Sequence, residues 1–292
     1  MPMARLPRIR IDAYRRHSFP EQRPVPTVMP WLDSYYQGML TPYGIQTDPV
    51  QMASGRNNSF LAMASHVLKE LHEECPLTDT GLFLMAHQTL DTFHPFQSTT
   101  TLLCRAFGIN APAVALTEQE RSTPCIGLTV LLAALRQPGF EGAGLLLVLD
   151  QATQPYRGDW HPRDSIDNAL VLRLKAAGDD AGTSLEGRRF WRENGVADAA
   201  WITQCIYAWL DTARVEMSAV DVVADGALAA SLSGAMPAAR VHETDRRYMS
   251  SADLVAVLDA LEAGARNVLL THLARDGHLY LFLFRQESQC ST

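Results

Sequence analysis

The sequence has no excess of positive charge. Its 32 acidic residues outnumber 25 basic ones and give a formal net charge of −7. A general nucleic-acid-binding protein needs a basic surface, so the balance argues against a nucleic-acid partner. Long apolar runs are also missing, since no segment approaches the ~18 residues of a membrane-spanning helix. We therefore expect no membrane span.

Cysteine and lysine are scarce. Five cysteines in 292 residues do not indicate a disulfide framework. No CxxC or CxxH spacing exists, so we expect no metal site, and nothing in the sequence calls for a cofactor. Only Lys69 and Lys175 are lysine, which indicates coding bias rather than function. No apolar stretch follows the five arginines of the first 16 residues, so we expect a cytoplasmic protein with free thiols.

What is present is an alternation of apolar strands and helices. Apolar residues make up 47% of the chain, enough for a sizeable core. Short continuous apolar runs predict buried strands at 81–86, 144–150 and 168–174, after an opening strand at 6–13. Helical spacing predicts helices over 59–74, 97–107 and 125–136. This alternation predicts an α/β fold.

The second part of the chain repeats this order in shorter form. Residues 176–195 are rich in glycine and charge, and we interpret them as the joint between two halves. A helix over 197–214, a strand near 221–224 and a helix over 251–264 follow. Asp276-Gly277 between two apolar runs predicts a hairpin. We expect two units, residues 1–175 and 176–292.

Several segments, in their order along the chain, resemble the thiolase-like condensing enzymes, and among them the ketoacyl-ACP synthase III group. They are LPRIRIDAY, the segment 43–47, the segment 85–108, STPCIGLTVLLAAL at 122–135 and SIDNALVLRL at 165–174. The resemblance implies a thiolase-like α/β fold, with two pseudo-symmetric halves of layered helices and mixed sheets (αβαβα). It covers most of the chain.

The resemblance places the family's catalytic cysteine on Cys125. A cysteine at the start of a buried helix lies where free N–H groups and the helix dipole favour a thiolate. The resemblance implies that Cys125 takes an acyl group from acyl-CoA or an acyl carrier protein. On helix position alone, a small buried core residue is the preferred interpretation of Cys125, and the resemblance is what favours the nucleophile.

The chain departs from the family at two other positions. Gly226 stands where the family has a catalytic histidine, and Tyr248 stands where it has an asparagine. We take the neighbouring Asp225 and His242 as candidate catalytic bases. Their alternative interpretations are a helix N-cap aspartate and a surface histidine at a strand end. The departures disfavour decarboxylating chain extension.

Substrate-binding candidates follow from the same comparison. His87 lies on the loop after a predicted strand, where α/β sites gather. Tyr248, Arg246 and Arg247 fall in the departing segment, and arginines suit a phosphate-bearing donor or an acidic carrier. A solvated charged face is the simpler interpretation of each arginine alone. The remaining histidines are interpreted as packing or surface residues; they are His66, His72, His272 and His278.

Three functional hypotheses remain open. The first is an acyltransferase acting through Cys125, as a homodimer or with a second condensing enzyme. The second is a non-catalytic partner subunit of a heterodimeric condensing enzyme, which the lost histidine and asparagine favour. The third is an unrelated α/β cysteine hydrolase, which needs a histidine late in the chain, and His242 or His272 would serve.

Overall fold

The structure is a computed structural model of the chain. It describes residues 7–20, 30–48, 58–89, 97–117, 120–156, 164–177, 182–191 and 198–287, together with Met52, Arg56, Asp91 and Thr92. His94 on the loop after the predicted strand 81–86, Arg192 in the segment 176–195 and Cys290 near the end of the sequence lie outside these ranges. No helix of the described part is long and apolar enough to cross a membrane.

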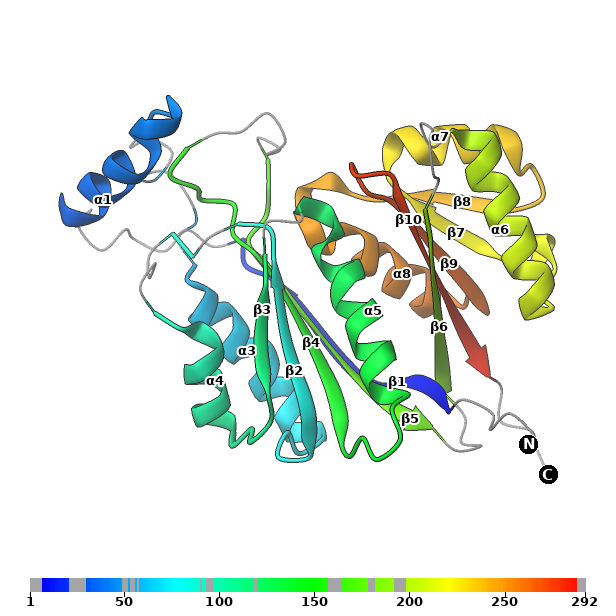
Figure 1. The fold of residues 1–292 in the computed structure, drawn as a ribbon, viewed down its shortest axis with the longest axis horizontal. Coiled ribbons are helices and arrows are strands. Elements are labelled where there is room, and N and C mark those ends of the chain that lie inside the picture. Colours follow the sequence, from blue (N-terminus) through cyan, green and yellow to red (C-terminus); the bar gives the residue numbers. More distant parts are fainter. Residues whose placement is uncertain are drawn as a thin grey trace.

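Ten strands form one mixed sheet in the order β3-β2-β4-β5-β1-β6-β10-β9-β7-β8 (Figure 1). The first half contributes β1 (Arg8–Ser18), β2 (Thr80–His87), β3 (Ala113–Leu116), β4 (Ala143–Asp150) and β5 (Asn168–Ala177). The second half contributes β6 (Gly182–Trp191), β7 (Asp221–Ala224), β8 (Arg240–Glu243), β9 (Asn267–Leu273) and β10 (His278–Glu287).

The strand order repeats about the β1–β6 pair. Read outward from that pair, each half has two antiparallel neighbours and then parallel strands, β1-β5-β4-β2-β3 and β6-β10-β9-β7-β8. The two halves expected from the sequence are therefore present as pseudo-symmetric sheets. The division at residue 175 stays a prediction, since β5 continues to Ala177.

The helices lie in three layers around these sheets (Figure 1). The middle layer is α5 (Thr123–Leu135) and α8 (Ala252–Glu262), whose apolar side chains share one core with strands of both halves. The outer layers are α3 (Phe60–Glu74) with α4 (Thr99–Phe107), and α6 (Ala199–Ala213) with α7 (Gly226–Ala235). A further helix, α1 (Pro30–Leu40), lies to one side of the first half.

Local sequence accounts for most of these elements. Ser59 caps α3 by accepting a hydrogen bond from the N–H of Ala62, and Gly108 ends α4 with a positive φ. Helix α5 is apolar nearly all round, and its buried side packs against strands of both halves, whereas Val130 on the other side is 40% exposed. Gly277 takes φ +86° in the predicted hairpin between β9 and β10.

Two predictions need correction. Residues 182–191, expected as part of a joint, form strand β6, which pairs with β10 along its whole length. The sequence did not indicate this strand, because the faces of β6 are largely accessible and carry polar residues. Helix α7 and strand β8 were not predicted either. Both are short and interrupted by small or charged residues, so their apolar periodicity is weak.

Buried polar groups fix the segment before α8, the 3-10 helix η4 (Arg246–Ser251), against the first half. The carboxylate of Asp150, at the end of β4, accepts hydrogen bonds from the Ser250 hydroxyl (2.8 Å) and the Ser251 N–H (2.9 Å). The Ser251 hydroxyl donates to the side-chain oxygen of Asn168 on β5 (2.6 Å). These bonds position the first turn of α8 beside the start of α5.

Candidate active site

The start of α5 carries two nucleophilic side chains, Ser122 and Cys125. Ser122 is the N-cap residue, yet its side chain makes no capping hydrogen bond. One reason is local, because Pro124 stands at the second helical position and has no N–H to donate. The Ser122 hydroxyl is therefore free to bond elsewhere.

The Ser122 hydroxyl is hydrogen-bonded to His272 on β9. Its Nε2 lies 2.9 Å from Ser122 Oγ. Along β9, Val268 and Leu270 face the core shared with α5, whereas Leu269 faces the outer core. Alternation therefore directs His272 toward α5. The ring is buried, with 6% of the residue exposed.

Asp253, in the first turn of α8, holds the other side of the histidine ring. Its Oδ2 lies 2.7 Å from His272 Nδ1, and its Oδ1 accepts a hydrogen bond of 2.9 Å from Arg121. Burial acts to raise the pKa of Asp253, but the bonds and charges of His272 and Arg121 outweigh it, so this pKa lies below its ordinary value. Asp253 is thus an ionised carboxylate that orients His272.

Cys125 lies beside this pair but deeper in the core. Its Sγ and the ligand atoms of Asp253 and His272 all lie within 4.8 Å of one another. Cys125 is only 2% exposed. Burial, followed by the charge of Asp253, raises the pKa of the Cys125 thiol well above its ordinary value, against a smaller opposing effect of Arg121. The cysteine rests as a neutral thiol and needs a base to react.

A pocket of about 230 Å³ opens beside Ser122 and His272. Its lining includes Ser122, His272, Arg121, Arg246, Glu120 and Met249. Glu120 and Met249 have positive φ values of 49° and 47°, which residues other than glycine rarely adopt. Such backbone strain gathers at functional sites, where the surrounding structure holds it in place.

Cys125, Asp253 and His272 are also the residues of the described part whose donor atoms lie close enough together to hold a metal ion. Their donor atoms are already engaged, since both ring nitrogens of His272 are hydrogen-bonded. The Arg121 guanidinium also lies against the carboxylate of Asp253. A divalent cation would face that positive charge, so the site fits an acid–base pair better than a metal.

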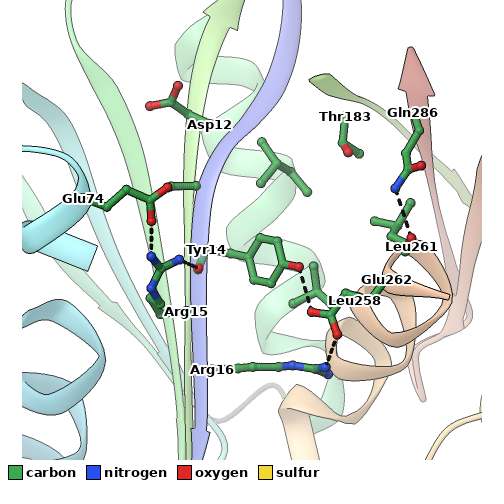
Figure 2. Close-up of a pocket in the computed structure, with 12 residues that line it drawn as sticks. Asp12, Tyr14, Arg15, Arg16, Glu74, Thr183, Leu258, Leu261, Glu262 and Gln286 are labelled. Carbon is green, nitrogen blue, oxygen red and sulfur yellow. Dashed lines mark hydrogen bonds and ion pairs between the residues drawn. The ribbon is translucent and has the colours of Figure 1, made fainter. Parts of the chain in front are cut away.

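A larger pocket of about 540 Å³ lies elsewhere, where β1 leaves β6 after Ile11 (Figure 2). Figure 2 shows Tyr14 and Arg16 of β1 directed toward Glu262 on α8. The Tyr14 hydroxyl donates to Glu262 (2.7 Å), and Arg16 pairs with Glu262 and with Asp259. These contacts tie β1 to α8, and the described lining of this pocket contains no serine, cysteine or histidine.

Solved structures share this architecture. ChlB3, described as an acyltransferase, matches with a TM-score of 0.66 and 14% identity, covering 97% of this chain and 98% of that one. The chain has the thiolase-like fold. The 3-oxoacyl-(acyl carrier protein) synthase III of Pseudomonas aeruginosa, FabH, matches with a TM-score of 0.62 and 13% identity, over 96% and 99% of the two chains.

OleA of Xanthomonas campestris matches similarly, with a TM-score of 0.63 and 11% identity over 95% of this chain and 98% of that one. No family model and no curated protein sequence matches the chain. The comparisons confirm the predicted thiolase-like fold. They also remove the hypothesis of an unrelated α/β hydrolase fold, although His272, which that hypothesis named, is the histidine beside Cys125.

Asp225 follows the end of β7 and is the N-cap residue of α7, which was the alternative interpretation of this aspartate. One carboxylate oxygen accepts from the N–H of Leu228 (3.2 Å), and the other lies 3.6 Å from Arg121. Asp225 lines the pocket, but both oxygens are engaged. Gly226, which the motif comparison aligns with the family's histidine, offers no side chain to the pocket, and a Cβ there would displace the flexible Glu243 carboxylate, 2.5 Å away.

His242, His87 and Tyr248 are not brought to the pocket lining. His242 sits on the edge strand β8, with Nε2 3.5 Å from Asp221. His87 ends β2 facing α3, where its ring packs edge-on against Phe60. Tyr248 lines a separate pocket with Arg16 and Val255. From the same segments, Gln88 and Met249 line the pocket instead, one residue along the chain.

The two predicted arginines are separated. Arg246 lines the pocket, and its guanidinium lies near Gly226 and Glu243. Arg247 is exposed and bonds Asp245 through two nitrogens, at 3.0 and 2.6 Å. Pocket residues that the sequence did not single out include Arg121, Ser122 and Arg275. Asp253, which bonds His272 Nδ1, was not singled out either. For His272, the available signal was strand alternation in NVLLTHL, which places the histidine on the α5 side.

Proposed function

We propose that the chain is a ketoacyl-synthase-III-like acyltransferase that forms an acyl thioester on Cys125. The observation that carries the proposal is the His272–Asp253 pair, whose ligand atoms lie within 4.8 Å of the Cys125 sulfur. This pair supplies a base that the vacated family histidine does not. Asp225 and His242 are no longer needed in that role.

The reaction follows from these groups. His272 Nε2 takes the thiol proton of Cys125, and the thiolate attacks the carbonyl carbon of the donor thioester. The N–H groups in the first turn of α5 lack intrahelical partners and stabilise the oxyanion. The C–S bond to the donor breaks, and the donor thiol leaves with the proton from His272. The acyl group then passes to an amine, alcohol or carbon nucleophile.

The donor is an acyl-CoA or an acyl carrier protein. Arg246 and Arg275 line the pocket and offer guanidinium groups to a phosphate or an acidic carrier surface. Glycine at position 226, in place of the family's histidine, supports transfer without decarboxylation. The described cysteines are free thiols, which fits the cytoplasmic location that we propose. We expect a transferase of lipid or specialised-metabolite biosynthesis.

The proposal includes a dimer. Strand β3 lies at the sheet edge, where it pairs only with β2, and the Val114 side chain is 45% exposed. An exposed apolar edge strand offers unpaired backbone groups to a second chain. A second copy, or a second condensing enzyme in a heterodimer, would cover this edge.

Intact-protein mass measured after incubation with a panel of acyl-CoA and acyl-carrier donors tests the proposal. Wild-type protein gains one acyl mass, and neutral hydroxylamine removes it because the bond is a thioester. Cys125→Ala gains none, whereas Cys205→Ala, a partly buried cysteine on α6, loads like the wild type. A hydroxylamine-sensitive adduct that persists in Cys125→Ala refutes loading on Cys125.

The same experiment addresses the non-catalytic hypothesis. A silent partner subunit stays unmodified with every donor, and acyl mass appears only on a complete condensing enzyme co-purified with it. The presence of the buried His272–Asp253 pair beside Cys125 favours the active enzyme over this alternative.

A further inference from the structure

We propose that Ser122 is a second activated nucleophile, and that Ser122, His272 and Asp253 give the protein an esterase activity on small acyl esters. This activity goes beyond acyl loading on Cys125 and needs no CoA or carrier donor. It uses the same histidine and the same pocket, so the two nucleophiles share one base.

Geometry carries the inference. Ser122 Oγ lies 2.9 Å from His272 Nε2, and His272 Nδ1 lies 2.7 Å from Asp253 Oδ2. Nucleophile, base and orienting carboxylate thus form one hydrogen-bonded chain from α5, β9 and α8. A serine hydroxyl is activated by a base at this distance when a third group fixes the base.

Access separates Ser122 from Cys125. Both Ser122 and His272 line the 230 Å³ pocket. Ser122 is also the residue bonded to His272, whereas Cys125 is 2% exposed and its thiol proton is held tightly. In the resting structure, the group that a small ester reaches beside the base is the serine.

The sequence around Ser122 keeps its hydroxyl available. An N-cap serine ordinarily accepts a hydrogen bond from the N–H two or three residues later. Pro124 removes one of these donors, and Ser122 has an αR backbone with no side-chain cap. The preceding Glu120 has a positive φ of 49°. A serine that served only to begin α5 would turn its hydroxyl to the helix.

The proposed step balances as follows. The proton of Ser122 Oγ moves to His272 Nε2 as Oγ bonds to the acyl carbon. The ester C–O bond breaks, and the leaving alcohol takes the proton from Nε2. Water then attacks the acyl-serine with the same base, which releases the carboxylic acid and restores the serine. Asp253 remains an anion throughout, bonded to Nδ1 and to Arg121.

A fluorophosphonate probe with peptide mapping by mass spectrometry tests the inference on the whole chain. We expect one phosphonate per molecule on the peptide that holds Ser122, and hydrolysis of p-nitrophenyl butyrate that Ser122→Ala lowers by at least about 1,000-fold. Ser231→Ala, an exposed serine on α7, is the matched control and labels like the wild type.

Asp253 is a positioning residue in this scheme. Asp253→Asn slows labelling by at least about 100-fold, and Asp253→Glu restores part of the rate at an equal melting temperature. A purely structural role would change the melting temperature and not distinguish the two variants.

Absence of phosphonate from Ser122 in folded wild-type protein overturns the inference without any variant. Acyl loading on Cys125 together with an unlabelled Ser122 leaves the proposed function and removes this one. If Ser122 is labelled but no thioester donor loads the chain, the esterase inference stands and the proposed function falls. The two failures are therefore distinguishable.

Discussion

At the scale of single residues, burial acts in opposite directions on two aspartates near the site. Asp253 has a basic neighbour on each side, and its pKa is lowered despite burial. Asp150 is equally buried, but its partners are neutral serine groups, so burial prevails and raises its pKa to about 6. The identity of the neighbours thus decides which carboxylate stays ionised.

The raised pKa predicts a pH-dependent stability. The folded chain holds the Asp150 proton more tightly than the unfolded chain, so this contribution is full below the ordinary pKa of 3.8 and is lost as pH rises through about 6. Asp150→Asn removes it. Between pH 4 and pH 7, the free energy of unfolding of the wild type falls relative to the variant by about 2 kcal/mol.

Urea titrations at a series of pH values measure this difference. Asp245→Asn is the control, because the bond from Arg247 lowers the pKa of Asp245 and its contribution has the opposite sign. If the Asp150→Asn profile ran parallel to the wild type, the carboxyl group would already be ionised at low pH.

At the scale of elements, α5 is positioned by close contact with strands of both halves. A Cβ at Gly187 on β6 would lie 2.8 Å from Leu132 of α5 and 2.8 Å from the ring of Phe282 on β10. A glycine here lets α5 approach the second sheet. The contact lies in the last turn of α5 and fixes that end of the helix against the second sheet.

Gly187→Ala tests this approach. Overpacking against Leu132 and Phe282 lowers the free energy of unfolding by about 1–3 kcal/mol. In the matched control Gly234→Ala, on α7, the added Cβ meets nothing within 4 Å, and the loss of unfolded-state entropy raises stability by about 0.5 kcal/mol. Equal effects of the two substitutions in denaturant titrations would contradict a packing role for Gly187.

At the scale of the whole molecule, the site exists only where the two halves meet. Ser122 and Cys125 come from the first half, and Asp253 and His272 come from the second. The middle layer of α5 and α8 brings them together. Bonds from Asp150 to the segment before α8 and the contacts of β1 with Glu262 hold the halves in register.

The exposed edge of β3 gives the prediction for assembly. Val114→Lys places a charge on this edge, and we expect the dimer to dissociate into monomers, measured by sedimentation equilibrium. Tyr207→Lys, at an equally exposed position on the outer helix α6, leaves the dimer intact. A wild-type protein that sediments as a monomer, or a Val114→Lys dimer of unchanged affinity, rules out this edge as the interface.

Local patterns in the sequence were enough to predict the fold class and most elements. Apolar runs such as residues 144–150, helical spacing in 59–74 and the Asp276-Gly277 turn are local signals, and the structure has the corresponding strand, helix and hairpin. The order of short motifs was enough to predict the thiolase-like fold and to single out Cys125. These signals suffice because burial and turn chemistry act over a few residues.

The groups that surround Cys125 are set by the packing of the two halves, which local sequence patterns do not show. His272 lies 147 residues after Cys125 by the printed numbering, and no local pattern distinguishes it from a packing histidine. Its place follows from the register of β9 beneath α5, and that of Asp253 from the anchoring of α8 by Asp150. The motif comparison led to Asp225 and Tyr248, because it transfers positions along the chain. A base, however, is defined by distances across the core, which are set when the two halves pack.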